Sequence, residues 1–181
     1  MWKPSHVITN QELVKAYNAY AEKFNVENAT DIESGNIEAK PLSSAEFIEK
    51  ASGIKARYAY IKDGILDVDR MRPRIPERSE GELSHQAEMA LNAARVALEE
   101  ANKDASSVDA VIVGCAYTER SYPAIAIEVQ EQLGVDGFGF DMLVACSAAT
   151  FALQRAYEMI SAGTARCVLV VNPELTSPQV N

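Results

Sequence analysis

The residue whose type and position best suit chemistry is Cys146. It ends the apolar run Leu143-Val144-Ala145 and precedes the small residues Ser147-Ala148-Ala149, which predict the start of a helix. A helix N-terminus carries a partial positive charge that favours a thiolate, the nucleophilic form of cysteine. Cys146 is therefore a candidate nucleophile for covalent catalysis. The alternative is a buried, unreactive cysteine that packs as a small apolar side chain.

The other cysteines fit the unreactive alternative better. Cys115 ends one predicted core strand, and Cys167 begins another. No pair of cysteines has metal-ligand spacing, and the histidines His6 and His85 are isolated, so we expect free thiols and no zinc or iron–sulfur site. His85 is expected to be an exposed or half-buried helix residue.

The elements that position Cys146 are predicted to alternate between helix and strand. Helices are expected at 79–102, 123–133 and 147–162, and strands at 108–115, 137–143 and 167–171. This alternation predicts a mostly parallel α/β sheet, and the continuous apolar strands suit a sheet covered by helices on both faces. Such folds place their chemistry at the carboxyl ends of the strands, where Cys146 would lie.

The first third of the chain is predicted to contain helices and loops. A capping box at Thr9 and Glu12 opens a helix over about 10–24, and the next, at Ser43 and Glu46, opens a short helix that Gly53 ends. The first helix is expected to bury Leu13, Tyr17, Tyr20 and Phe24. The remaining segments are read as loop or short helix (25–42), strand (54–61) and surface excursion (62–79). A third capping box, Ser79 with Glu82, opens the helix over 79–102.

Length and composition bound the class of protein. With 181 residues, 48% of them hydrophobic and 24% charged, the chain can fold around one sizeable core. The net charge of −9 argues against nucleic acid or an anionic membrane as a partner. No apolar run is long enough to cross a bilayer and no signal-peptide pattern is seen, so a cytoplasmic location is expected.

Positive charge is concentrated in one segment. It contains Arg70, Arg72, Arg74 and Arg78, interleaved with Pro73 and Pro76. The favoured interpretation is a solvated loop whose arginines pair with the nearby acids Asp67, Asp69 and Glu77. The alternative is a local binding site for a phosphate or an acidic carrier.

Several short motifs, in this order and spacing, resemble β-ketoacyl-acyl carrier protein synthase III, a thiolase-fold condensing enzyme. They are Val7-Ile8-Thr9-Asn10-Gln11-Glu12-Leu13, Glu46-Phe47-Ile48, Ser52-Gly53-Ile54-Lys55-Ala56-Arg57, Val108-Asp109-Ala110-Val111, Tyr122-Pro123-Ala124, Phe140-Asp141-Met142 and Ala145-Cys146-Ser147-Ala148. The resemblance covers the whole chain. It implies that residues 1–181 form a single N-terminal half of a five-layered αβαβα fold, truncated at both ends.

The resemblance implies a function for Cys146. The family's cysteine takes an acyl group from a coenzyme A or carrier-protein thioester, and malonyl-acyl carrier protein then decarboxylates and attacks that group. Such a protein is an acyltransferase of fatty acid biosynthesis. Acyl-CoA and acyl carrier protein would be its partners, in a homodimer. No cofactor is implied beyond the coenzyme A or phosphopantetheine thioester that serves as substrate.

Three further residues are implied to bind substrate. Phe47 stands where the family has a Trp that stacks on the adenine of coenzyme A, and Ala51 replaces a nearby family Arg, with Lys50 as a substitute. Tyr122 matches the aromatic that closes the partner's acyl pocket across the dimer. Thr176 matches a residue that lines that pocket. The alternative for Tyr122 and Thr176 is ordinary packing. The segment 62–79 is longer than in the family and is expected to reshape the substrate entrance.

Other functions remain open at this stage. The family's catalytic His and Asn and an oxyanion-hole glycine lie in its second half, so the chain alone is expected at most to be acylated on Cys146. A hydroxymethylglutaryl-CoA synthase-like, thiolase-like or long-chain head-to-head condensing activity would use the same cysteine. A non-catalytic dimerisation or acyl-binding half-domain is the alternative from a different class.

Overall fold

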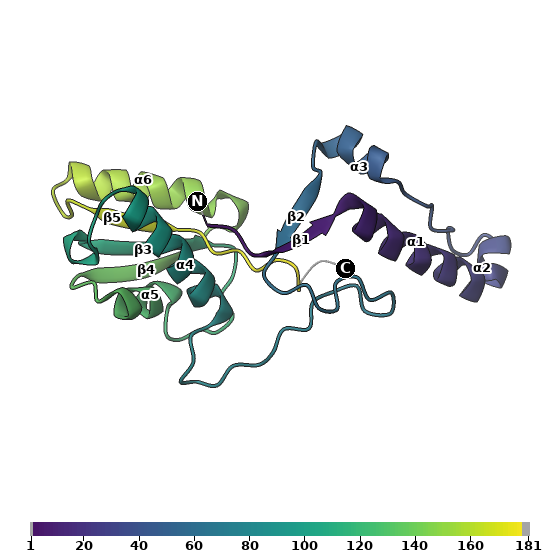
Figure 1. Ribbon diagram of the computed structural model, residues 1–181, viewed down its shortest axis with the longest axis horizontal. Coiled ribbons are helices and arrows are strands. Elements are labelled where there is room, and N and C mark those ends of the chain that lie inside the picture. The colour runs from purple at the N-terminus through teal and green to yellow at the C-terminus, as the bar shows by residue number, and fades with distance from the viewer. Residues whose placement is uncertain (1, 179–181) are drawn as a thin grey trace. The chain divides into compact units, whose positions relative to one another are not determined.

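A computed structural model describes residues 2–178. Contacts divide the chain into two compact units, which are described separately (Figure 1). The sheet unit comprises residues 2–3 and 77–175, and the groove unit comprises residues 4–76 and 176–178. Cys146 lies in the sheet unit.

The sheet unit contains a three-stranded parallel sheet in the order β4-β3-β5. Its strands are β3 (Ala110–Cys115), β4 (Phe138–Leu143) and β5 (Val168–Val171). The central strand β3 pairs in parallel with both neighbours, with Ala110 opposite Phe138 on one side and Val168 on the other. The three strands predicted for this part of the chain are thus confirmed, each within a few residues of its expected bounds.

Helices cover both faces of this sheet, as the sequence predicted. They are α4 (His85–Glu100), α5 (Ile125–Leu133) and α6 (Ala148–Ser161). Alternate side chains of β3 point to opposite faces. Val111 and Val113 join one core cluster with α4 and α5, whereas Ala110 and Ile112 join a second with α6. Figure 1 shows the resulting three layers, with α6 on one side of the sheet and α5 on the other.

The outer side of α6 is unusually apolar. Leu153, Tyr157 and Ile160 form an exposed stripe along one flank, and Phe151 is exposed on the other. An exposed apolar face of this kind is typical of a helix that packs against further protein. Among residues 2–178, no helix has both the length and the apolar character that spanning a membrane requires.

The start of α4 differs from the prediction. Ser79 and Glu82 do form the expected hydrogen bond, with Ser79 N–H donating to Glu82 Oε2 over 2.8 Å, but it closes a turn before the helix. The true N-cap is Ser84, whose hydroxyl accepts from the Ala87 N–H. The expectation that His85 is exposed or half-buried is wrong, because the first turn of α4 is enclosed and His85 is only 4% exposed.

The groove unit contains an antiparallel strand pair and three helices. The strands are β1 (His6–Thr9) and β2 (Ala56–Ala59), and the helices are α1 (Asn10–Glu27), α2 (Ala29–Glu33) and α3 (Ala45–Ser52). Strand β1 was not predicted, because four residues are too few to show a clear alternation. The cap of α3 is Ser44 rather than the predicted Ser43, and Gly53 ends this helix with a left-handed φ of 71°.

The prediction for the buried side of α1 is wrong. Its large side chains Leu13, Tyr17, Tyr20 and Phe24 are half-buried, and the small Ala16 and Ala21 are buried instead. Two causes are visible. Leu13 and Tyr17 line an open groove, and the Lys40 ammonium lies over the other two rings, 5.5 Å from the centroid of Tyr20 and 4.7 Å from that of Phe24.

The capping box of α1 predicts a pH dependence. Glu12 accepts hydrogen bonds from Lys62 Nζ (2.7 Å) and Thr9 N–H (2.9 Å), which lower its pKa from 4.5 to about 2. Because the folded pKa lies below the ordinary value, the stabilisation is complete above about pH 4.5 and is lost as the pH falls toward about 2.

We expect Glu12→Gln to lower the urea midpoint at pH 7 and to match the parent chain near pH 2. Glu22→Gln, an exposed acid on the same helix, is the control. An unchanged midpoint at pH 7 would contradict the assignment.

Candidate nucleophile and substrate groove

Cys146 lies in the short connection between β4 and α6. Strand β4 ends at Leu143, a 3₁₀ turn spans Ala145–Ser147, and α6 begins directly afterwards. Ala145 has a left-handed φ of 46°, which costs a non-glycine residue about 1–2 kcal/mol. Strain of this kind clusters at functional turns. These bounds confirm the expected place of Cys146 between a strand end and a helix start. Its side chain is exposed.

The N-terminus of α6 suits an anion. Its N-cap Ser147 makes no side-chain capping hydrogen bond, and the first turn carries no acid. The unsatisfied N–H groups and the helix dipole therefore favour a negative charge beside them. The first charged side chain after Cys146 is Arg155, more than two turns along the chain. No acidic side chain of this helix turn lies beside the position of Cys146.

A close approach of β3 holds the start of α6 in place. A Cβ added at Gly114 would lie 2.7 Å from Asn172 Oδ1 and 2.9 Å from the Ala148 carbonyl oxygen. Any larger residue would push against the first turn of α6. Gly114 thus permits the carboxyl end of the central strand to reach the turn that carries Cys146.

The three cysteines have different surroundings. Cys115 is fully buried, and desolvation, with smaller contributions from the Asp141 and Glu174 carboxylates, raises its pKa to about 11. Cys167 is half-buried just before β5, and its N–H donates to Asp109 Oδ2 over 2.9 Å. All three thiols are free, and among residues 2–178 no cluster of three His, Cys, Asp or Glu side chains could hold a metal ion.

These surroundings predict an order of alkylation. At pH 8 we expect iodoacetamide to modify Cys146 first, because it is exposed, and Cys115 last, because it is buried and its pKa is raised. Peptide mapping over a time course gives the three rates. The folded chain should show this order and the urea-unfolded chain should not. Equal rates for the three thiols in the folded chain would count against a distinct environment for Cys146.

Two carboxylates, the half-buried Asp141 and the buried Glu128, organise the sheet unit, and neither was proposed as a site residue from the sequence. Asp141 on β4 accepts from the backbone N–H groups of Ile125 and Ala126, each over 2.8 Å, and so caps α5 from another element. Glu128 accepts from the N–H and hydroxyl of Ser84, each over 2.8 Å. The sequence contained a signal for both residues: Asp141 is an acid inside an apolar strand, and Glu128 is an acid on an apolar helix face.

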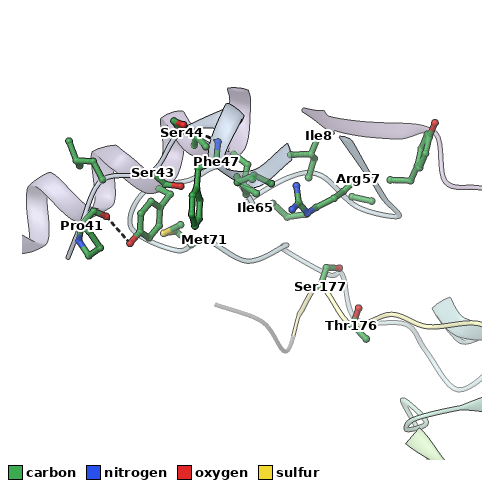
Figure 2. Close-up of a pocket in the computed structure, with 17 residues that line it drawn as sticks. Ile8, Pro41, Ser43, Ser44, Phe47, Arg57, Ile65, Met71, Thr176 and Ser177 are labelled. Carbon is green, nitrogen blue, oxygen red and sulfur yellow. Dashed lines mark hydrogen bonds between the residues drawn. The ribbon is translucent and has the colours of Figure 1, made fainter. Parts of the chain in front are cut away.

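The groove unit contains an apolar groove with a volume of about 1110 Å³. Phe47 on α3 and Thr176 both line it, together with Tyr17 and Met71 (Figure 2). Phe47 is 66% exposed, which leaves its ring available for stacking. Two of the residues implied to bind substrate are therefore brought to one cavity from opposite ends of the chain.

The other implied substrate residue lies elsewhere. Tyr122 is in the sheet unit, between β3 and α5, and is 87% exposed. Such exposure agrees with a side chain that reaches another surface, but its role stays a prediction. Ala51 and Lys50 are exposed on α3 and do not line the groove. The roles of Cys146, Phe47 and Thr176 in binding or catalysis are likewise predictions.

Comparison with known proteins first defines the class. The fold matches 3-oxoacyl-[acyl-carrier-protein] synthase III from Aquifex aeolicus, with a TM-score of 0.67 and 26% identity, over 99% of this chain and 44% of that one. The priming β-ketosynthase from the R1128 polyketide pathway matches with a TM-score of 0.65 and 26% identity, over 97% of this chain and 40% of that one. The chain therefore has the thiolase-like fold of the condensing enzymes.

The sequence comparisons find similarity to one kind of condensing enzyme. Residues 140–181 match the family model of 3-oxoacyl-[acyl-carrier-protein (ACP)] synthase III. The β-ketodecanoyl-[acyl-carrier-protein] synthase of Pseudomonas aeruginosa is 49% identical over 168 residues, which are 93% of this chain and 48% of that protein. The β-ketoacyl-[acyl-carrier-protein] synthase III of Ruegeria is 32% identical over 147 residues, 81% of this chain and 39% of that protein.

The resemblance inferred from the motifs is thereby confirmed. The chain is similar to the N-terminal half of β-ketoacyl-acyl carrier protein synthase III and spans less than half the length of these relatives.

Proposed function

We propose that this chain carries the acyl-accepting cysteine of a condensing enzyme of the β-ketoacyl-acyl carrier protein synthase III type. The observation that carries the proposal is the exposed Cys146 between β4 and the uncapped N-terminus of α6. In the first step, the Cys146 thiolate attacks the carbonyl carbon of an acyl thioester. The new carbon–sulfur bond replaces the old one, and the departing thiol takes up the proton that Cys146 lost.

The complete protein would then extend the acyl group. A malonyl-acyl carrier protein loses carbon dioxide, and the resulting carbanion attacks the acyl-cysteine to give a β-ketoacyl thioester of fatty acid biosynthesis. Covalent catalysis suits this reaction because it separates acyl transfer from carbon–carbon bond formation. Acyl-CoA and acyl carrier protein as partners, a homodimer and a cytoplasmic location are parts of the same proposal.

The named relative suggests an acyl-chain length. The Pseudomonas protein is a β-ketodecanoyl-[acyl-carrier-protein] synthase, and its identity to this chain is 49%. A malonyl group contributes two of the product carbons, so a ten-carbon product requires an eight-carbon primer. We extend this to the present chain and propose a medium-chain acyl thioester as the donor to Cys146.

Intact-mass measurement tests the proposal. The purified chain is mixed separately with acetyl-, octanoyl- and palmitoyl-CoA, and released thiol is measured in parallel. We expect a mass increase of one acyl group, fastest with octanoyl-CoA. No increase with any of the three, from a chain that is folded by circular dichroism, would favour a non-catalytic acyl-binding or dimerisation module. A faster reaction with acetyl-CoA would contradict only the chain length.

A further inference from the structure

The segment between β2 and α4 contains a folded loop, residues 62–74, here called the arginine loop. Its backbone is closed by several hydrogen bonds, among them Arg74 N–H to the Asp63 carbonyl oxygen at 2.8 Å and Met71 N–H to the Asp67 carbonyl oxygen at 2.7 Å. Gly64 has a φ of 84°, and a Cβ there would lie 2.6 Å from the Arg72 carbonyl oxygen. The loop is therefore a packed structure, although it has no helix or strand.

The acids of the arginine loop are already compensated. Arg74 donates to both Asp63 and Asp67, and its hydrogen bond lowers the pKa of the Asp67 carboxyl. Asp69 pairs instead with Lys23 on α1. The expected pairing of this arginine cluster with its neighbouring acids is thus confirmed for Arg74 and Asp67. Arg70 forms no such ion pair and makes only the smallest contribution, a Coulombic one, to the lowered pKa of Asp67, and Arg72 pairs with none of these acids.

Arg70 and Arg72 remain as surplus positive charge. Both are exposed, and within residues 2–178 neither forms an ion pair with a carboxylate. The Arg70 guanidinium is oriented by the carbonyl oxygens of Arg72 (Nε, 3.2 Å) and Pro73 (Nη2, 3.4 Å). The two side chains share a cavity of about 430 Å³ with Asp67, Asp69 and Arg74. The planar guanidinium groups of arginine match phosphate oxygens in geometry and charge.

The residue between these arginines belongs to the apolar groove. Met71 lines the groove with Phe47, and it adopts a left-handed φ of 52°, which is strained for a methionine (Figure 2). Residues 70–72 therefore contribute an apolar side chain to the groove, from Met71, and positive charge beside that side chain, from Arg70 and Arg72. A ligand with an aromatic base beside several phosphates combines the same two chemistries.

We propose that Arg70 and Arg72 bind the phosphates at the nucleotide end of a coenzyme A thioester whose base lies against Phe47. The inference rests on the proposed function. It assigns phosphate recognition to the arginine loop and base stacking to Phe47, whose ring is 66% exposed.

Calorimetry with three probes tests this assignment on the full chain: coenzyme A, adenosine 3′,5′-bisphosphate and pantetheine. We expect Arg70→Gln and Arg72→Gln each to weaken coenzyme A binding about tenfold, since each removes charge-assisted hydrogen bonds. Adenosine 3′,5′-bisphosphate should lose affinity in parallel, and pantetheine, which has no phosphate, should be unaffected. Arg155→Gln, an exposed arginine on α6, is the matched control.

Several outcomes would overturn the proposal. They are an unchanged affinity of the double variant for coenzyme A, an equal loss in Arg155→Gln, and weakened binding of an acyl carrier protein with coenzyme A unaffected. The last result would make the loop a protein-docking surface. The single variant Arg72→Gln is expected to stay folded, because it removes no ion pair, so a loss of binding in this variant reports on the phosphate contact itself.

The acylation assay separates this inference from the proposed function. If octanoyl-CoA acylates Cys146 with the same KM in the double variant and the parent chain, only the arginine assignment fails. If the parent chain is not acylated but still binds adenosine 3′,5′-bisphosphate in an Arg72-dependent way, the proposed function fails and the phosphate site stands.

Discussion

Cys146→Ala should abolish acyl transfer to the chain, lowering the rate of acyl-protein formation from octanoyl-CoA at least about 1000-fold. The physical reason is that the side chain supplies the attacking atom, and no other thiol shares its setting. Cys115 is fully buried with its pKa raised to about 11, and Cys167 is half-buried before β5. The measurement is intact mass over time.

The control for this substitution is Cys167→Ala, which also removes one thiol. It should leave the acylation rate within about twofold of the parent chain, because this sulfur lies outside the β4–α6 turn. Because Cys146 is exposed, its replacement by alanine should leave the urea midpoint nearly unchanged. Persistent acylation in Cys146→Ala would assign the chemistry to another residue.

Glu128→Ala should give the largest loss of stability that this structure predicts, about 3–5 kcal/mol in the free energy of unfolding. Its carboxylate is buried and accepts from Arg120 Nη2 at 2.8 Å as well as from the N–H and hydroxyl of Ser84. Ser84 in turn caps α4 by accepting from the Ala87 N–H at 3.1 Å. Removing the carboxylate takes away the ionic partner of the Arg120 guanidinium, which keeps only its hydrogen bond to the Glu82 carbonyl oxygen, and it removes two acceptors that hold Ser84, the cap of α4.

Urea unfolding followed by circular dichroism measures this effect. Glu131→Ala, an exposed acid one turn later on α5, should change the free energy of unfolding by no more than about 0.5 kcal/mol. Glu128→Gln should fall between the two, because the amide keeps one acceptor. Equal stability of Glu128→Ala and Glu131→Ala would contradict the proposed role of this network.

Local sequence patterns were sufficient to predict the strands of the sheet unit and the presence of its helices. All six residues of β3 are buried. The continuous apolar run of this strand predicted a strand covered on both faces. The junction at Cys146 was equally local, because the strand, the turn and the small residues of α6 are adjacent in sequence. Gly53 and Gly134 end helices in left-handed conformations that the sequence pattern suggested.

Features that depend on distant contacts were not predictable in this way. Helix α4 starts after Ser84, which donates hydrogen bonds to Glu128, 44 residues away. The nearby Ser79–Glu82 hydrogen bond, which the sequence suggested as the cap, lies before the helix. Asp141 caps α5 across the fold, from a position 16 residues after Ile125. The groove is lined by both Phe47 and Thr176, and its openness explains why Leu13 and Tyr17 of α1 are half-buried. Only the resemblance to a family connected those two residues beforehand.

The sulfur atom of Cys146, Sγ, is the atom proposed to receive the acyl group. The most direct test is to incubate the folded chain with octanoyl-CoA, digest it at mildly acidic pH and locate the acyl group by tandem mass spectrometry. We expect one octanoyl group, on the peptide that contains Cys146. An octanoyl group on Cys115 or Cys167, or an unmodified Cys146 that still reacts with iodoacetamide, would contradict it.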